Sequence, residues 1–387
     1  MKKYFLGAAA LLALTACSND ETVDLNQDGN VISFAVTANN PSRAAANEVF
    51  NPNALPQSFT VYAAYDGKTY FQNETFTKQG ATSNYNSAKT HYWPAVDGEK
   101  KVTFVAFRNA GDDLSTNFIW KPNAASTLSY TVPATAAEQT DFIYAVTNSQ
   151  RPIGGQVGLN FRHALAQVVF KAKVTNPNLY VEIKGVSVCK AYNKGTFTFP
   201  FDKVTDPNHK DDQEGAFNFD ATTQGSWSVQ DDSQTNYALT FDKVGIANGH
   251  TENLTAHDAV RVTDANTLLL LPQKTTPWTV GTHGSKPEDQ AGSYFLVQCR
   301  IRNVANGTSV DEDKDVYLWG SSSEYKEVAV PATFDWKQGK KYIITFEFGN
   351  GNGGYDPDNS DPVLVPISFT VTVDDFAKGD DQTVEMK

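Results

Sequence analysis

The stretch Val363-Leu-Val-Pro-Ile-Ser-Phe-Thr-Val-Thr-Val373 decides the fold class of this chain. Every second side chain in it is apolar, and a period of two places those side chains on one face of a strand. That face consists of Val365, Ile367, Phe369, Val371 and Val373. The stretch therefore predicts a half-buried strand. The residues before it, 349–362, are rich in Gly, Asn, Asp and Pro, and we expect them to form a flexible linker.

Short β-rich runs bounded by Gly, Pro, Asn or Asp recur along the rest of the chain. They are 31–38, 58–65, 102–107, 127–132, 142–147, 165–175, 180–189, 195–199, 237–241, 267–271, 294–301, 325–330 and 342–348. The run 165–175 has some helical spacing, but Val168, Phe170, Ala172 and Val174 alternate with more polar neighbours, which favours a strand. With no long helical pattern between these runs, we expect an all-β chain of two tandem β-sandwich domains, each of about seven strands.

Composition excludes several classes of protein. The chain has 387 residues with a formal net charge of −12, so a basic surface for nonspecific nucleic-acid binding is not expected. It has three cysteines, too few for a disulfide scaffold, so packed apolar side chains must supply most of the stability.

The N-terminus has the pattern of an export signal. Two lysines precede the apolar stretch 4–14, which is too short to cross a bilayer as a helix. Leu14-Thr-Ala-Cys17 then resembles a bacterial lipobox, in which Cys17 would receive the lipid. The acidic residues that follow are similar to the tag that places lipoproteins of Bacteroidetes on the outer face of the outer membrane. The alternative is an ordinary signal peptide cut after Ala16.

A second informative segment lies near the mature N-terminus. Its side chains Ile32, Phe34 and Val36 share one strand face, and a loop with Asn, Pro, Ser and Ala around Arg43 follows. Pro and Asn keep such a loop out of regular strand pairing, and the small residues leave the bond between Arg43 and Ala44 open to an Arg-specific protease.

The two terminal strands carry nearly the same hexapeptide. Ile32-Ser-Phe-Ala-Val-Thr37 and Ile367-Ser-Phe-Thr-Val-Thr372 agree at five of six positions, with the apolar residues at the same pleat parity. Such a match arises by chance about once in a chain of this composition, so the positions of the two copies matter more than the match. One copy precedes the cleavable Arg43 and the other ends the predicted linker, which is the arrangement that donor-strand exchange requires.

Catalytic and metal-binding motifs are weak. Residues 349–354 match the dinucleotide fingerprint by letter, but the Pro- and Asp-rich residues after them cannot open a phosphate-binding helix. Asp311, Asp313 and Asp315 alternate like calcium ligands, yet Val316 and Ser322 occupy the positions that need Gly and Glu. The sequence therefore predicts no enzyme, no cofactor and no metal site. For the two cysteines in predicted strands, Cys189 and Cys299, a buried free thiol and a disulfide both remain open.

Several motifs together resemble the fimbrillin-like proteins of Bacteroidia, the type V pilins, which are made as major-fimbrillin-like lipoprotein precursors. Besides the lipobox and the Ser-Arg-Ala loop, the motifs are Asp141-Phe-Ile-Tyr-Ala145, Leu159-Asn-Phe-Arg-His163, Leu268-Leu-Leu-Leu-Pro-Gln273, Trp336-Lys-Gln-Gly-Lys-Lys-Tyr342 and Val371-Thr-Val-Asp-Asp375. The resemblance implies two transthyretin-like β-sandwich domains, export as an outer-membrane lipoprotein, and cleavage after Arg43. Cleavage in such pilins removes the first strand, and the C-terminal strand of another subunit takes its place.

We therefore expect a structural subunit of a cell-surface fimbria, of the stalk type because a donor strand is present. Its expected partners are other copies of itself or related subunits, an Arg-specific protease, the outer membrane through Cys17, and host or bacterial surface ligands. The expected parts are the signal 1–16, the lipidated removable segment 17–43, domains 44–162 and 163–348, and the linker with donor strand 349–387. The alternative is a non-polymerising surface lipoprotein that binds glycan through exposed tryptophans, for which the candidates are Trp93, Trp120, Trp227, Trp278 and Trp319.

Overall fold

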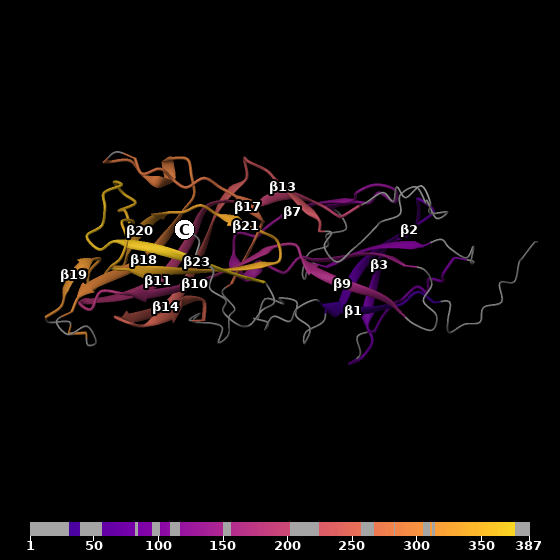
Figure 1. Cartoon of the computed structure of the whole chain (residues 1–387), viewed down its shortest axis with the longest axis horizontal. Helices are drawn as coiled ribbons and strands as arrows, with labels where there is room; N and C mark the ends of the chain where they lie inside the picture. Colours follow the sequence, from indigo (N-terminus) through magenta and orange to yellow (C-terminus); the bar gives the residue numbers. More distant parts are fainter. Residues whose placement is uncertain are drawn as a thin grey trace, which may run out of the picture.

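The computed structural model in Figure 1 shows an elongated molecule built almost entirely of strands. It describes residues 31–38, 56–81, 84–94, 101–108, 117–149, 156–201, 224–256, 267–281, 283–304, 310–311 and 314–375. The helices described in full in these ranges are three short 3₁₀ turns, η2 (Ala136–Glu138), η3 (Leu254–Ala256) and η4 (Pro287–Asp289). No helix among the described residues is long and apolar enough to cross a membrane.

The first seven-stranded sheet closes on itself as a barrel in the order β1-β4-β3-β2-β5-β8-β9. All contacts between neighbouring strands are antiparallel except the one that closes the barrel, where β1 runs parallel to β9. The strands are β1 (Phe34–Ala38), β2 (Ser58–Tyr65), β3 (Lys68–Lys78), β4 (Asn84–Ser87), β5 (Val102–Arg108), β8 (Ile143–Ser149) and β9 (Val157–His163).

The barrel strands β2, β5 and β8 are buried on both faces, which explains their nearly continuous apolar runs. In β5, for example, Phe104 and Ala106 point into the barrel while Val105 and Phe107 belong to the core outside it. The outer face is covered by a small sheet in the order β13-β12-β7-β6. Its strands are β6 (Phe118–Ile119), β7 (Thr127–Thr131), β12 (Lys194–Thr198) and β13 (Ser226–Val229). Because β7 and β12 come from the two halves of the chain and pair with each other, this sheet ties the halves together.

Two five-stranded sheets form a sandwich in the second half of the chain. In one sheet β15 (Thr251–Asn253), β10 (Ala166–Val174), β22 (Lys340–Phe348) and β23 (Ile367–Asp375) follow one another, and β16 (Leu268–Leu270) also pairs with β10. In the other, β14 (Gln234–Ala247), β11 (Leu179–Tyr192), β18 (Tyr294–Asn303) and β19 (Val316–Trp319) follow one another, and β20 (Lys326–Pro331) also pairs with β18. A short ribbon of β17 (Gln273–Lys274) and β21 (Asp335–Trp336) completes the fold.

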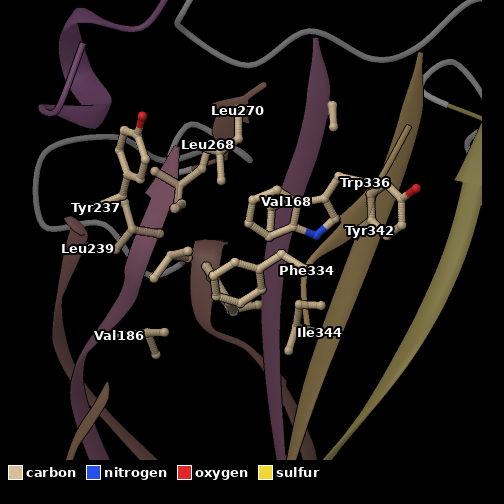
Figure 2. Packing of buried hydrophobic residues seen from close by; sticks show 14 of the residues in the cluster. Val168, Val186, Tyr237, Leu239, Leu268, Leu270, Phe334, Trp336, Tyr342 and Ile344 are labelled. Atoms are coloured by element: carbon tan, nitrogen blue, oxygen red, sulfur yellow. The ribbon is translucent and has the colours of Figure 1, made fainter. Parts of the chain in front are cut away.

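The sandwich core is formed by apolar side chains that alternate along these strands. Figure 2 shows Val168 and Ile344 of one sheet facing Val186 and Leu239 of the other. Next to them the rings of Phe334 and Trp336 stack with centroids 4.5 Å apart. The same core includes Phe142 and Tyr144 on the outer face of the barrel, so the packing continues from the sandwich to the barrel.

The all-β prediction is confirmed, and the run 165–175 is the strand β10, as its alternation indicated. The closure of β1 to β5, β8 and β9 into a barrel was not expected, because it depends on the parallel contact between β1 and β9, which lie more than a hundred residues apart in the sequence. The expected division of the chain into domains at residue 163 stays a prediction.

Candidate functional site

Strand β1 completes the barrel between β9 and β4. It pairs with β9 from Phe34 opposite Val157 to Ala38 opposite Phe161, and with β4 where Phe34 lies opposite Tyr85. Before the strand proper, the Ile32 amide donates a 2.8 Å hydrogen bond to the His91 carbonyl. Both edges of β1 are thus paired, and the barrel would be open between β9 and β4 without it.

The apolar face of β1 points into the centre of the barrel. Ile32, Phe34 and Val36 are 1%, 0% and 4% exposed, which agrees with the single face expected for them. The ring of Phe34 meets Phe76 and Phe104 edge to face, with centroids 4.7 and 5.1 Å apart. Burial of such side chains stabilises a fold by about 1.5–3 kcal/mol each, so β1 is a major part of the barrel core.

The chain enters β1 at the end of the barrel that is remote from the sandwich. Ala38 lies beside Phe161, two residues before the end of β9, and β9 leads directly into the sandwich strand β10. At the opposite end of β1, Val31 forms a β-bridge with Tyr92, and the Tyr70 hydroxyl donates a 2.5 Å hydrogen bond to the Tyr92 carbonyl. We call this end, with Tyr70 and Tyr92, the barrel pole.

Strand β23 carries the second copy of the hexapeptide and forms an edge of the sandwich. It pairs with β22 from Ile367 opposite Phe348 to Asp375 opposite Lys340, and it has no second partner strand in the described part of the chain. Ile367 is fully buried, but Phe369 and Val371 are only partly buried against the core.

The remaining members of the expected donor face also point inward. Val365 is buried, and Val373 is partly buried against the same core. The face predicted from alternation therefore exists, and in this structure it covers the chain's own sandwich.

The linker 349–362, expected to be flexible, is folded onto the sandwich, as are residues 363–366, which complete the segment 349–366 before β23. Tyr355 and Ala329 exchange two backbone hydrogen bonds of 2.8 and 2.9 Å, and the hydroxyl of the buried Ser360 donates a 2.6 Å bond to the Ser285 carbonyl. Gly349 has a positive φ of 90°, so a glycine at this position allows a turn and does not by itself indicate mobility. Leu364, near the end of the segment, is 81% exposed.

The remaining predicted site residues lie outside the described residues. These are the lipidation residue Cys17 and the two residues at the expected cleavage position, Arg43 and Ala44. Their roles stay predictions.

The two cysteines of the folded part are free thiols and are both buried. Cys189 packs with Trp278 and Tyr294, whereas Cys299 lies in the sandwich core, so the disulfide alternative does not hold in this structure. Burial raises the pKa of Cys189 to about 12 and also raises that of Cys299, which makes both thiols unreactive.

The acidic loop considered for calcium is held by protein groups. Asp311 pairs with Lys314 at 2.7 Å, and Asp315 accepts a 2.8 Å hydrogen bond from the Asp311 amide. Asp313 is outside the described residues. No cluster of His, Cys, Asp and Glu suited to a metal ion occurs among the residues that the structure describes.

The five tryptophans considered for glycan binding are buried or half-buried. Trp93 and Trp278 lie in hydrophobic cores, while the indole nitrogens of Trp120 and Trp227 donate hydrogen bonds to Thr69 and to a backbone carbonyl. The fifth, Trp319, packs against the sandwich core. None of the five is among the exposed large hydrophobic side chains of the described residues.

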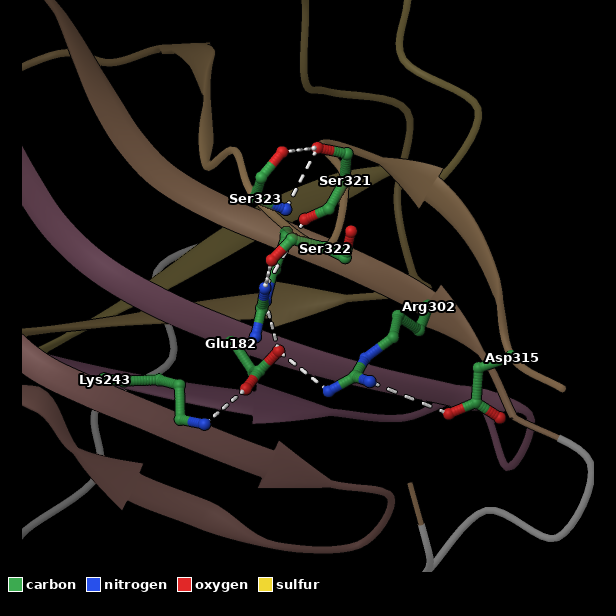
Figure 3. A network of polar contacts seen from close by, with 8 residues as sticks. Glu182, Lys243, Arg302, Asp315, Ser321, Ser322 and Ser323 are labelled. Carbon is green, nitrogen blue, oxygen red and sulfur yellow. Dashed lines mark hydrogen bonds and ion pairs between the residues drawn. The ribbon is translucent and has the colours of Figure 1, made fainter. Parts of the chain in front are cut away.

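Sequence reasoning missed a buried charge network on β11 and β18, shown in Figure 3. Glu182, which is 1% exposed, accepts hydrogen bonds from Arg300 at 2.5 Å and from Arg302 at 2.9 Å, and Lys243 lies 3.2 Å away. Burial alone would raise the pKa of Glu182, but hydrogen bonds from Arg300 and Lys243 and the nearby positive charges outweigh it and lower the pKa. Charged residues at alternate positions of two predicted strands were the available signal.

Comparison with known proteins identifies one family. A family profile described as fimbrillin-like matches residues 27–375. Among solved structures, the chain is similar to a fimbrial protein from Bacteroides vulgatus, with 14% identity, a TM-score of 0.49, and coverage of 90% of this chain and 99% of that one. It is also similar to a fimbrial assembly protein from Parabacteroides distasonis, with 10% identity, a TM-score of 0.40, and coverage of 92% and 100%. No curated protein matches the chain by sequence.

Proposed function

We propose, because the chain belongs to the fimbrillin-like family, that it is a stalk subunit of a cell-surface fimbria that polymerises when β23 of one copy replaces β1 of another. The observation that carries the proposal is the shared apolar face of the two terminal segments, which consists of Ile32 just before β1, Phe34 and Val36 in β1, and Ile367, Phe369 and Val371 in β23. The subunit is a structural protein without enzymatic activity or cofactor. Its precursor is a lipoprotein held in the outer membrane through Cys17.

The position of β1 in the barrel supports a role as a removable strand. Cleavage between Arg43 and Ala44 would separate β1 from the rest of the barrel. Loss of the strand would leave β4 and β9 with unpaired edges and would expose the aromatic rings of Phe59, Phe76 and Phe104 that surround Phe34. An exposed apolar groove between two strand edges binds an added strand by main-chain hydrogen bonds and side-chain burial.

The position of β23 supports a role as the donor. As an edge strand with one partner, it can leave without dividing a sheet into two. The segment 349–366 before it would have to unfold from the sandwich, and its 18 residues could then extend by about 60 Å. That reach is comparable with the length of a domain, so the strand can enter a neighbouring barrel.

Cleavage at Arg43 provides the decisive experiment. The precursor should be incubated with an Arg-specific protease and observed by electron microscopy, with mass spectrometry to locate the new N-terminus. We expect filaments from the wild type and none from Arg43→Ala. The control Arg43→Lys should form filaments only if the protease also cleaves after lysine. If Arg43→Ala remains uncleaved and still forms filaments in normal yield, the proposal is overturned.

A further inference from the structure

We infer that Leu364 of one copy packs on Tyr70 and Tyr92 at the barrel pole of the next copy, and that this contact holds the exchanged strand against withdrawal from the groove. The inference rests on the proposed function, since it specifies the surface through which two copies of the chain meet. Leu364, Tyr70 and Tyr92 lie outside the matched hexapeptide, and the exchange itself does not require a contact between them.

The first step is the alignment of the two strands. With Ile367 in the place of Ile32, Phe369 takes the place of Phe34 and Val371 that of Val36, so every inward side chain has an apolar equivalent. The residue before Ile367 then takes the place of Val31, which bridges to Tyr92. Leu364 lies two residues further back along the donor, where the chain leaves the barrel pole.

The second step is the exposure of the groups that would meet. Leu364 is 81% exposed, the most of any large apolar side chain in the described ranges. Tyr70 and Tyr92 are 37% and 38% exposed, more than any other Phe, Tyr or Trp side chain in those ranges. The hydrogen bond from the Tyr70 hydroxyl to the Tyr92 carbonyl holds the Tyr70 side chain beside residue 92. A leucine on such a surface is removed from water together with both rings.

The third step is that these groups cannot meet within one copy. The start of β22 lies next to the barrel, because the Gly339 amide donates a hydrogen bond to the carbonyl of Leu165, just after β9. The end of β22, Phe348, pairs with Ile367, so Leu364 lies at the end of the sandwich remote from the barrel. In Figure 1 that end, near β19, is at the left, and β1 to β3 are at the right. A contact between the two ends therefore joins different copies, head to tail.

The contact would solve a problem of register. A donor strand that slips by two residues still presents the same face to the groove, because side chains alternate with a period of two. Such a slip moves the strand by about 6.6–6.8 Å along its axis. A slip that withdraws the donor by two residues carries Leu364 away from Tyr92, whereas the opposite slip brings Leu364 to the place of Val31, opposite Tyr92. A contact at the pole thus disfavours the withdrawn registers, which the alternating Ile367, Phe369 and Val371 tolerate.

Disulfide trapping tests the contact directly. Subunits with Leu364→Cys should be polymerised with subunits carrying Tyr92→Cys, which keeps the backbone carbonyl that Tyr70 binds. We expect covalent oligomers on non-reducing gels after boiling. The matched control pairs Leu364→Cys with Ile119→Cys, whose side chain is 57% exposed on the small sheet, and should stay unlinked. Cys189 and Cys299 are buried and should not interfere.

A second variant measures the contribution of the contact. Leu364→Ser should leave the thermal stability of the monomer unchanged, because the side chain is exposed, and should reduce polymer yield about tenfold, which corresponds to about 1.4 kcal/mol. Val316→Ser, which changes another exposed apolar side chain of the sandwich, should have no effect on yield. Polymers that form normally without the 364–92 crosslink, or with unchanged yield from Leu364→Ser, would overturn this inference alone. Absence of polymers from the cleaved wild type would instead overturn the proposed function.

Discussion

Replacement of Phe34 by alanine should destabilise the precursor and leave the polymer untouched. Phe34 is fully buried and its ring contacts Phe59, Phe76 and Phe104. Removal of a phenyl ring from such a site costs about 3–5 kcal/mol. The total stability of a domain is only about 5–15 kcal/mol, so the barrel of the variant should unfold at clearly lower urea concentration.

The same substitution in β23 should give the opposite pattern. Phe369 is only partly buried in the monomer, so Phe369→Ala should cost about 1–2 kcal/mol there. In the proposed polymer Phe369 occupies the place of Phe34, and its loss should cost about 3–5 kcal/mol at every junction. Heating in detergent should then dissociate Phe369→Ala polymers well before those of the wild type.

The assay compares urea unfolding of uncleaved monomers with detergent dissociation of polymers from the same preparations. On the proposed mechanism the polymerised chain begins at Ala44, so polymers from Phe34→Ala and from the wild type are chemically identical. Phe34→Leu serves as a control, with a smaller loss in the precursor and none in the polymer. A lower dissociation temperature for Phe34→Ala polymers would mean that β1 stays in the assembled subunit, which refutes the reasoning.

Two further predictions concern the sandwich. Glu182→Gln should destabilise the protein by about 3–5 kcal/mol at pH 7, because it leaves Arg300 buried without its anion and Arg302 with only Asp315, 3.9 Å away, and thermal unfolding measures the loss. The folded-state pKa of Glu182 lies below its ordinary value of 4.5, so the stability that its carboxylate contributes is complete above 4.5 and is lost as pH falls through the lowered pKa. The difference in stability between the wild type and Glu182→Gln should therefore shrink below about pH 4. A constant difference down to about pH 3 would contradict this assignment. Cys189 and Cys299 should not react with Ellman's reagent in the native protein and should react fully in denaturant; rapid labelling of the native protein would show that the sandwich opens.

The sequence predicted best the strands that form one continuous β-rich run between turn residues. Strand β2 begins and ends at the expected residues, whereas β3 was missed although it is eleven residues long. Its buried residues Phe71 and Phe76 are five apart, an odd spacing that regular alternation does not allow. The cause is an irregularity around Asn73, which has a φ of 55° and shifts the register against β2.

The candidate site was predicted in part, for a related reason. Alternation alone identified the inward faces of β1 and β23, because a strand face is a local property of the sequence. It could not indicate that Phe34 meets Phe104 or that β1 pairs with β9, since these contacts depend on how distant segments meet. The composition of 349–362 indicated flexibility, but there Gly349 permits a turn and Ser360 is buried. Gly and Ser in a sequence indicate which backbone conformations a segment can adopt, but they do not indicate whether the folded segment is flexible.

The difference in burial between the two strands gives the proposed exchange its direction. In its own sandwich β23 has one partner strand, and Phe369 and Val371 are partly exposed. In the place of β1 it would have two partner strands, and the same side chains would be buried as completely as Phe34 and Val36. The gain from these side chains is about 1–3 kcal/mol, and each added main-chain hydrogen bond contributes about 0.5–1.5 kcal/mol.

Release of the segment 349–366 opposes that gain. The hydrogen bonds between Tyr355 and Ala329 and those of Ser360 must break before β23 can reach another copy. While β1 remains part of the same chain, it also competes at a high effective concentration that no second molecule can match. On the proposed mechanism, cleavage after Arg43 would remove this advantage, because β1 would then be a separate peptide that can dissociate. The proposed order of events follows from this competition: the bond at Arg43 breaks first, and only then does β23 of another copy bind more tightly than the strand it replaces.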